Sequence, residues 1–327
     1  MILVTGGAGF IGSNITATLA ERGVAVAVCD RFRTADKWRN LAKVALRDVV
    51  APEELSSWLD THTAELEAIV HMGAISSTTE PDVDLIMEVN FRLSMQLWRW
   101  CALHGKRFIY ASSAATYGAG EQGFDDDPSL EALAKLRPLN AYGWSKHLFD
   151  RWVVRELADG APRPPQWAGL KFFNVYGPNE YHKGGMQSVV AQKYPLAAAS
   201  KALTLFRSHR PDVPDGGQKR DFVYVGDCVN VVSWLLEHPG VNGLFNLGTG
   251  HARTFEDLGR ALYAALGQPF EVEYVAMPEV IRPNYQYFTE ASMERLRQAG
   301  YTRPFTSLVD GVREYVERYL SKPDRFR

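Results

Sequence analysis

The chain has 327 residues, of which 46% are hydrophobic, and its 36 basic and 38 acidic side chains give a formal net charge of -2. This length suffices for one large α/β domain with a smaller lobe, and the balanced charge gives no electrostatic basis for binding nucleic acid or an anionic membrane. The longest apolar stretches are well short of the about 20 residues that span a bilayer, and the first residues lack a secretory pattern. We therefore expect a soluble, cytoplasmic protein.

The residues that most often hold metals or disulfides show no such pattern here. Cys29, Cys101 and Cys228 lie far apart in mostly apolar surroundings, which is typical of reduced core thiols. The eight histidines show no spacing typical of metal ligands. We predict neither a disulfide framework nor a metal site.

In chain order, residues 1–30 predict a strand, a glycine turn, a helix and a second strand. Further strands are expected at residues 68–71, 106–112 and 167–174, and residues 85–104 and 142–156 have helical periodicity. Strands that alternate with helices predict a parallel sheet covered on both faces. The expected fold class is therefore α/β, a doubly wound parallel sheet of the Rossmann type.

Beyond Asn174 the pattern changes, because Tyr176-Gly177-Pro178 and Gly184-Gly185 interrupt the periodicity. Residues 186–200 then look helical, and residues 222–225 and 244–247 look like strands that return to the first domain. We predict a Rossmann domain formed by residues 1–177 and continued by about 222–250. Residues 178–221 and 251–327 would form a smaller, discontinuous substrate-binding lobe.

The glycines of the first turn, Gly6, Gly9 and Gly12, follow a strand and open a helix. This is the context in which a glycine-rich turn brings the backbone close to a pyrophosphate at a helix N-terminus. We therefore predict a dinucleotide cofactor.

The end of the second strand indicates which dinucleotide it is. Asp30 is placed to bind the ribose hydroxyls of NAD, but Arg31, Arg33 and Lys37 follow, and such cations pair with the 2′-phosphate of NADP. We favour NADP, with NAD possible, and the alternative is that these cations are solvated loop residues.

A catalytic group is expected at the carboxyl end of the strand that precedes Ser112-Ser113. Tyr142 and Lys146, four residues apart at the start of a predicted helix, share one helical face and can converge with Ser113. The lysine charge is expected to lower the pKa of the phenol, and serine to orient the reacting oxygen.

These motifs, with the later stretches 173–178, 220–227 and 245–250, resemble the extended short-chain dehydrogenase/reductase superfamily over nearly the whole chain. Dehydratases of that superfamily usually carry an acidic pair after the serine, and decarboxylases usually carry a glutamate there. This chain has Ala114-Ala115, which favours epimerisation or simple oxidation.

Several separated stretches are similar to the ADP-L-glycero-D-manno-heptose 6-epimerase family, namely residues 1–14, 110–118, 139–150, 172–186, 219–227 and 285–289. The resemblance implies that Lys183, in His182-Lys183-Gly184, is a second catalytic base opposite Tyr142. C6 of the heptose is then oxidised by bound NADP, and hydride returns to the other face of the ketone. It further implies ADP-heptose as substrate, a homo-oligomer, pentameric in this family, and a place in the synthesis of lipopolysaccharide core heptose.

The same resemblance implies the ligand contacts. For the cofactor they are Gly6, Gly9, Phe10, Ile11, Gly12, Asp30, Arg31, Lys37, Met72, Gly73, Ala74, Ile75, Ser76, Asn90, Lys146 and Val175. For the substrate they are Ser113, Asn174, Gly185, Gln192, Phe206, Arg207, Ser208, His209, Arg220 and Tyr285. The family pattern usually differs at Met72, Gly185, Gln192 and Pro52.

Three of these assignments have structural alternatives. Arg220 is expected to bind the ADP diphosphate but could form a salt bridge with Asp221, Lys183 could be a solvated loop cation, and Tyr285 could be core. The rival functions are a UDP-hexose 4-epimerase, which needs no second base, a plain dehydrogenase or reductase, and a non-catalytic NADP-sensing protein.

Overall fold

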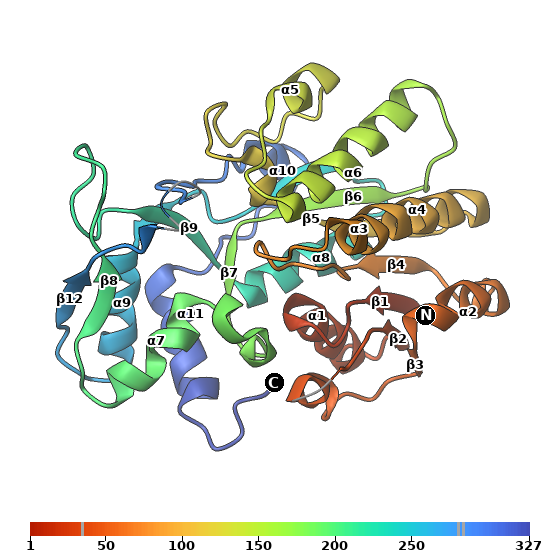
Figure 1. The fold of residues 1–327 in the computed structure, drawn as a ribbon. Helices are drawn as coiled ribbons and strands as arrows, with labels where there is room; N and C mark the ends of the chain where they lie inside the picture. Colours follow the sequence, from red (N-terminus) through yellow and green to blue (C-terminus); the bar gives the residue numbers. More distant parts are fainter. Residues whose placement is uncertain (34–35, 280–281, 283–284) are drawn as a thin grey trace.

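The chain is built around a seven-stranded sheet in which every neighbouring pair of strands is parallel (Figure 1). The computed structural model describes residues 1–33, 36–279, 282 and 285–327. The strand order is β10-β6-β5-β4-β1-β2-β3, with the bounds β1 Ile2–Thr5, β2 Val26–Cys29, β3 Asp48–Val50, β4 Ala68–His71, β5 Arg107–Ser113, β6 Trp167–Phe172 and β10 Gly243–Leu247. This is the order of a doubly wound dinucleotide-binding sheet, and the predicted fold class is confirmed.

Helices cover both faces of the sheet, which is why its strands are apolar on both sides. In β1, Ile2 and Val4 face one apolar cluster while Leu3 faces another. The first cluster includes residues of α1 and α8, and the second includes residues of α2, α4 and α6. These helices span Phe10–Glu21 (α1), Leu55–His62 (α2), Leu93–His104 (α4), Ala141–Ala158 (α6) and Val225–Glu237 (α8).

The strand order reverses between β1 and β4, the place where open α/β sheets bind ligands. The turn after β1 and the segment after β4 meet there. A Cβ on Gly6, whose φ is +64°, would lie 2.6 Å from the Gly73 Cα atom. Only glycine at position 6 therefore allows this contact.

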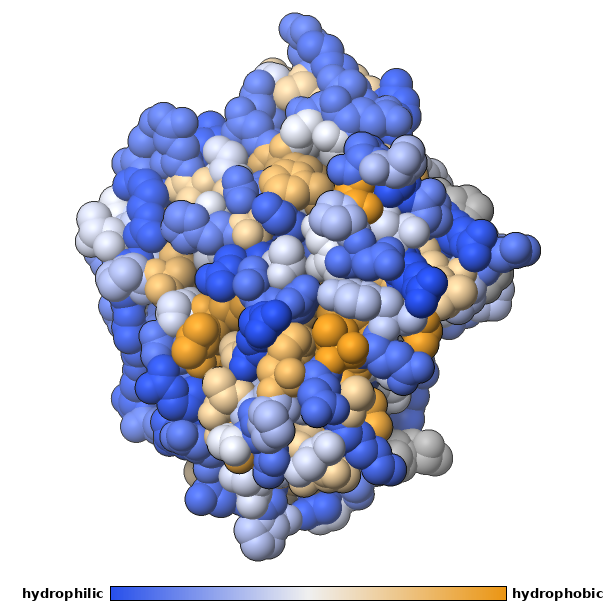
Figure 2. Space-filling view, turned by 90° about the vertical axis from the view of Figure 1, so that its left-hand side faces the viewer, coloured by the Kyte–Doolittle hydropathy of each residue, from blue (hydrophilic) through white to orange (hydrophobic). Residues whose placement is uncertain are grey.

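The smaller lobe contains a three-stranded and a two-stranded sheet, with the strands β7 Asn174–Tyr176, β9 Lys219–Tyr224 and β11 Ala252–Thr254 in one and β8 Leu203–Phe206 and β12 Val272–Val275 in the other. They share an apolar cluster with the helices α7 Val189–Ala198, α9 Phe255–Ala265 and α11 Leu308–Tyr315. Figure 2 shows the side of the molecule on which this lobe lies, where apolar residues are scattered among hydrophilic ones.

The predicted strand 167–174 is two strands in different sheets. β6 ends at Phe172, the Phe173 N–H donates to the Leu247 carbonyl at 3.0 Å, and Asn174 begins β7, which pairs with β9. The predicted strand 222–225 also lies in the small sheet: residues 222–224 belong to β9, and Val225 begins α8. The chain returns to the large sheet through α8, and β10 is the strand that rejoins it.

Some helices begin earlier than the sequence pattern predicted, and α7 begins later, at Val189 rather than at residue 186. α1 starts at Phe10, inside the predicted glycine turn, and the predicted helix 85–104 starts with α3, Val83–Ile86. A π-helical turn, η3, Met87–Arg92, separates α3 from α4 and carries Asn90. The remaining short elements are η1 Asp36–Leu41, η2 Pro52–Glu54, η4 Ala114–Tyr117, α5 Leu130–Lys135, η5 Tyr181–Met186, α10 Glu294–Gln298 and η7 Val316–Leu320.

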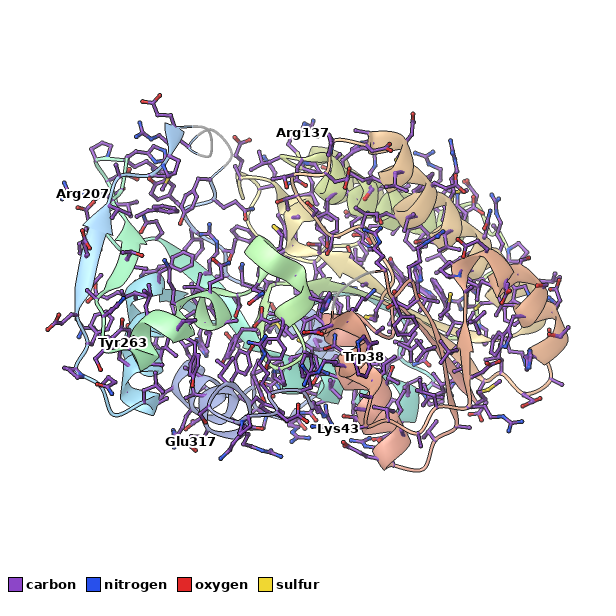
Figure 3. All side chains as sticks on the ribbon, turned by 60° about the horizontal axis from the view of Figure 1, so that its bottom comes forward. Trp38, Lys43, Arg137, Arg207, Tyr263 and Glu317 are labelled. Atoms are coloured by element: carbon purple, nitrogen blue, oxygen red, sulfur yellow. The ribbon has the colours of Figure 1, made fainter. Side chains whose placement is uncertain are left out.

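Residues 324–327, which we call the tail, cross from the lobe to the large domain beside η1 and α1 (Figure 1). The Arg327 guanidinium pairs with Glu21 at 3.0 Å. Phe326 is buried beneath Arg39, and its carbonyl accepts a hydrogen bond from Lys43, which is labelled in Figure 3. The tail therefore ties α1 to the segment that follows β2.

Two further sequence expectations can be compared with the structure. Cys29, Cys101 and Cys228 are buried and free of disulfides, as predicted. Among the residues described, no helix combines the length and the apolar character needed to span a membrane.

Candidate active site

The glycine turn leaves the N-terminus of α1 open. Gly9 is its N-cap, no side chain caps its first N–H groups, and its first turn holds no acidic residue. A Cβ on Gly12 would lie 2.2 Å from the Gly6 carbonyl oxygen, so the turn cannot accept a larger residue there. Free N–H groups at the start of a 12-residue helix fit a pyrophosphate.

Asp30 organises the side of the site that would bind the adenosine ribose. Its carboxylate accepts hydrogen bonds from the Ala8 N–H at 2.8 Å and the Arg31 N–H at 2.7 Å, and it pairs with Lys37 at 2.5 Å. The Arg31 guanidinium pairs with Glu53. Lys37 is mostly buried beside Asp30, whereas the Arg31 side chain is 56% exposed and its partner Glu53 is 58% exposed, so Arg31 is a solvated surface cation.

Asn90 fixes the segment that follows β4. Its side chain accepts a hydrogen bond from the Ile75 N–H at 2.8 Å and donates to the Ile75 carbonyl and to the Ser145 hydroxyl, both at 3.0 Å. Ser145 in turn donates to the Tyr142 carbonyl at 2.7 Å. The predicted cofactor segment, residues 72–76, is therefore connected to the start of α6.

Ser113, Tyr142 and Lys146 come together where η4 meets α6. Asn140 caps α6 by accepting a hydrogen bond from the Gly143 N–H at 2.8 Å. A Cβ on Gly143 would lie 2.7 Å from the Ala115 carbonyl oxygen, so glycine allows α6 to approach the Ser113 turn closely. This approach brings the Tyr142 phenol within hydrogen-bonding reach of Ser113.

Burial is the main cause of the pKa shifts of Tyr142 and Lys146. It raises the pKa of Tyr142 above its usual value, and hydrogen bonding to Ser113 opposes the rise. Lys146 does not contribute to this shift, so the predicted lowering of the phenol pKa by Lys146 is not seen, and desolvation sets the direction. Burial also lowers the pKa of Lys146 to about 8, although the Asp150 carboxylate acts to raise it.

Lys183 lies on η5, close to the glycine turn. Its ammonium is 5.4 Å from the centre of the Phe10 ring, and burial lowers its pKa while nearby Glu180 acts to raise it. Lys183 is thus not a solvated loop cation. The buried Glu180 anchors the loop by accepting hydrogen bonds from the Ser188 hydroxyl at 2.7 Å and the Tyr315 hydroxyl at 3.1 Å.

Two asparagines that the sequence reasoning missed connect the Lys183 loop to the glycine turn. The Asn40 side chain donates to the Ala8 carbonyl at 2.9 Å and to the Asn179 carbonyl at 3.0 Å. The Asn179 side chain donates to the Ser13 hydroxyl at 3.0 Å. Because Asn40 and Asn179 are 139 positions apart, no local sequence signal identifies the contact.

Four other predicted ligand contacts, Gln192, Gly185, Asn174 and Val175, differ in their surroundings. The Gln192 amide donates to the Gly185 carbonyl at 3.1 Å, so it shapes the loop. A Cβ on Gly185 would meet open space. The exposed Asn174 accepts a hydrogen bond from the Thr289 hydroxyl at 3.3 Å, and Val175 packs between the two large apolar clusters.

Arg220 is a buried cation, and its carboxylate neighbour does not pair with it. Asp221 instead accepts hydrogen bonds from backbone N–H groups of Thr249, Gly250 and Ala291. The Arg220 guanidinium contacts the Gln286 carbonyl and lies 5.3 Å from the centre of the Tyr285 ring. The alternative of a salt bridge with Asp221 is therefore wrong.

Residues Phe206, Arg207, Ser208 and His209 end β8 and begin the loop beyond it. The Tyr287 hydroxyl joins this loop to the Tyr285 segment, since it accepts from the His209 N–H at 2.9 Å. In Figure 3, Arg207 lies at the outer edge of the lobe, well away from Trp38 of η1. The structure thus places the predicted substrate contacts Arg207 and Arg220 in the lobe and the predicted cofactor contacts Asp30 and Lys37 in the large domain.

A charged pair that was also missed, Asp150 and Lys171, lies beneath the Ser113 turn. Asp150 follows Lys146 by four residues and shares its helical face, and a carboxylate on that buried face is a signal that could have been noticed in the sequence.

The parallel sheet, the glycine turn after β1 and the serine, tyrosine and lysine group after β5 define the extended class of short-chain dehydrogenases/reductases. Residues 2–248 match the NAD dependent epimerase/dehydratase family, and the chain belongs to this family.

Two curated relatives are similar over their whole length. The ADP-L-glycero-D-manno-heptose-6-epimerase of Nitratidesulfovibrio vulgaris (strain DP4) is 50% identical, with 100% of both chains covered. The enzyme of the same name from Fusobacterium nucleatum subsp. nucleatum is 45% identical, again with 100% of both chains covered. The predicted resemblance is confirmed.

Solved structures are similar as well. The ADP-L-glycero-D-manno-heptose-6-epimerase of Helicobacter pylori has a TM-score of 0.77 and 29% identity, covering 97% of this chain and 95% of that one. A UDP-glucose 4-epimerase of Thermus thermophilus, in complex with NAD, has a TM-score of 0.74 and 28% identity, with 97% of both chains covered.

Proposed function

We propose that the chain converts ADP-D-glycero-D-manno-heptose to the L-glycero form by epimerisation at C6, through transient oxidation with bound NADP and non-stereospecific return of hydride. The full-length similarity to curated heptose epimerases supports this substrate. The observation that carries the proposal is the presence of two partly buried proton-transfer groups, Tyr142 on α6 and Lys183 on η5. A 4-epimerase that rotates its sugar needs one such base.

The cofactor supplies reversible hydride transfer when bound, and the residues that would hold it are those of the glycine turn, Asp30, Arg31, Lys37, residues 72–76 and Asn90. Tyr142 exchanges the proton of the C6 hydroxyl on one face of the sugar, and Ser113 orients the oxygen. Lys183 exchanges the proton after the ketone has turned over. Lys146 contacts the ribose, while Arg220 binds the diphosphate.

The preference for NADP over NAD is part of the proposal. Arg31 and Lys37 support it, because each needs only to exchange a protein carboxylate for a 2′-phosphate. The family resemblance further implies a cytoplasmic homo-oligomer, a pentamer in this family, that acts in lipopolysaccharide core synthesis, and these remain predictions.

The test is to incubate the purified protein with ADP-D-glycero-D-manno-heptose, without added cofactor, and to follow the epimers by chromatography. We expect the L-glycero product with no net change in absorbance at the wavelength of NADPH. Net reduction of cofactor would indicate a dehydrogenase. No conversion by protein shown to contain cofactor would contradict the proposal, and turnover of UDP-glucose instead would favour a 4-epimerase.

A further inference from the structure

The only ion pair with both side chains fully buried, among the pairs that the described residues form, joins Asp150 of α6 to Lys171 of β6. The carboxylate oxygen and the ammonium nitrogen are 2.9 Å apart, and both side chains are 0% exposed. The chemistry proposed above makes no use of either residue. Their position beneath the Ser113 turn therefore calls for an explanation.

Further hydrogen bonds hold both members of the pair. The Asp150 carboxylate also accepts hydrogen bonds from the Ser112 hydroxyl at 2.7 Å and the Tyr110 hydroxyl at 3.1 Å. The Lys171 ammonium also donates to the Thr116 hydroxyl at 2.7 Å and lies 4.8 Å from the centre of the Tyr117 ring. Such a network holds its members in one arrangement.

Stability alone is a weak reason for such a pair. Removing two charges from water is costly, and apolar residues of similar volume often stabilise a protein equally well or better. What the charges add is a fixed connection between parts of the chain. We therefore expect the role of the network to lie in the parts of the chain that it connects.

The connection runs from α6 to the carbonyl of Ser113. Asp150 follows Lys146 by one helical turn and Tyr142 by two, on the same face of α6. Asp150 holds Lys171, Lys171 holds the Thr116 hydroxyl, and that hydroxyl donates to the Ser113 carbonyl at 2.8 Å.

We propose that Asp150 and Lys171 are a positioning pair that fixes the Ser113 turn against the helical face carrying Tyr142 and Lys146. The kinetic test of this proposal, with ADP-heptose as substrate, rests on the proposed function, whereas the NMR test without substrate does not.

The pair also acts on the charge of Lys146. The groups that face Lys146 are Asp150 and Tyr142 from its own helix and His71 from β4. Burial keeps His71 neutral by lowering its pKa to about 3, so Asp150 is the charged neighbour. Its carboxylate raises the pKa of Lys146, and a neutral residue there will let that pKa fall below about 8.

The experiment uses the double variant Asp150→Asn/Lys171→Met, which removes both charges together and keeps an acceptor for Ser112 and Tyr110. With ADP-heptose as substrate, we expect kcat to fall about 100-fold, because small displacements of catalytic groups have effects of this size, while KM changes little. The loss of kcat on the alkaline side should begin at lower pH. Lys171→Arg, which keeps the charge, should retain most of the activity.

The matched control is Glu131→Gln/Lys135→Met, which removes an exposed ion pair of 2.8 Å on α5 and should leave kcat unchanged. If the double variant does not fold by circular dichroism, Thr116→Val breaks the connection to Ser113 without touching the charges, and the same fall in kcat is expected. If the double variant folds, a kcat and a pH profile equal to those of the wild type would overturn the proposal. If Thr116→Val is used in its place, a wild-type kcat would overturn it.

A measurement without substrate separates the two proposals. In protein labelled with ¹³C at the lysine ε-carbons, the Lys146 signal is assigned by its loss in Lys146→Met and is followed by NMR against pH. We expect Asp150→Asn/Lys171→Met to titrate Lys146 at lower pH than wild type. If the wild type does not convert ADP-heptose, the proposed function is wrong, and the titration of Lys146 still tests the positioning pair. An unchanged midpoint in the double variant would exclude the pair.

Discussion

Three cations of the site, Lys146, Lys183 and Arg220, form no ion pair with any residue in the described part of the chain, and burial lowers the pKa of each. An unpaired buried cation is costly, so such groups are characteristic of sites that receive an anion or transfer a proton. Lys146 and Lys183 suit proton transfer because a lowered pKa makes the neutral amine accessible. Arg220 stays charged and suits the diphosphate.

Lys183→Met tests whether a second base exists. We expect kcat for heptose epimerisation to fall by about 10²- to 10⁴-fold, the usual contribution of a general acid or base, and Tyr142→Phe to have a similar effect. Both variants should still contain cofactor, measured by absorbance after denaturation. The exposed Lys201→Met serves as control, and activity of Lys183→Met equal to that of the control would exclude the second base.

Arg31→Ala tests the preference for NADP. A hydrogen bond to a charged group contributes about 1.5–3 kcal/mol, so the affinity for NADP should fall about tenfold or more while the affinity for NAD stays the same. Tryptophan fluorescence quenching or calorimetry on cofactor-free protein gives both affinities. Arg47→Ala removes a distant exposed arginine as control. Equal losses for NADP and NAD would mean that Arg31 does not bind the 2′-phosphate.

At the scale of the element, the N-terminus of α6 positions Tyr142. The Asn140 cap fixes the first turn of the helix, and Gly143 allows that turn to pack on Ala115. We therefore expect loss of the cap to disturb the position of Tyr142 as well as the helix.

Asn140→Ala should destabilise the protein by about 1 kcal/mol and also lower kcat, because an uncapped first turn holds Tyr142 less firmly. Ser307→Ala removes the cap of α11, whose Asp310 N–H lies 3.1 Å from the Ser307 hydroxyl. It should cost similar stability without the fall in kcat. Urea unfolding measures the stability of both variants, and steady-state kinetics measures their kcat. Equal kcat values for the two variants would mean that the Asn140 cap has no catalytic role.

The elements that the sequence predicted well are those with local signals. The strand, glycine turn and helix of residues 2–21, and the tyrosine and lysine on one face of α6, depend on neighbours within a few positions. The strand break at Phe173 was missed because Phe173 continues the apolar run of β6, and only pairing with β9 distinguishes the strand that follows. Pairing across the sheet and the bond of Asn40 to Asn179 depend on tertiary structure, which periodicity does not contain.

At the scale of the whole molecule, buried titratable groups make stability depend on pH. His71 is fully buried between the Thr5 and Ser94 hydroxyls, and burial lowers its pKa to about 3. The unfolded chain takes up this proton near pH 6.5, so the stabilising effect is present above pH 6.5 and is lost as the pH falls towards 3. Asp126 acts in the opposite direction, because burial raises its pKa to about 6 and its contribution is lost as the pH rises through 6.

His71→Gln isolates the histidine contribution. Between pH 7.5 and pH 5, the free energy of unfolding of the wild type should lose about 2 kcal/mol that the variant does not lose, since protonation of His71 then favours the unfolded chain. Urea unfolding of both proteins at the two pH values measures this difference. The same pH dependence in wild type and variant would show that His71 is not the group responsible.

The tail has a consequence for the synthesis of the protein. Its contacts join residues that are as many as 313 positions apart, from Arg327 to Asn14, and Phe326 packs on Tyr181 of the loop that carries Lys183. A chain that emerges from the ribosome can form its first strands early, since domains fold from the N-terminus during translation. The contacts of the tail with α1, η1 and the Lys183 loop cannot form until residues 324–327 have been synthesised. A nascent chain would therefore contain a folded sheet for some time before it contains a finished active site.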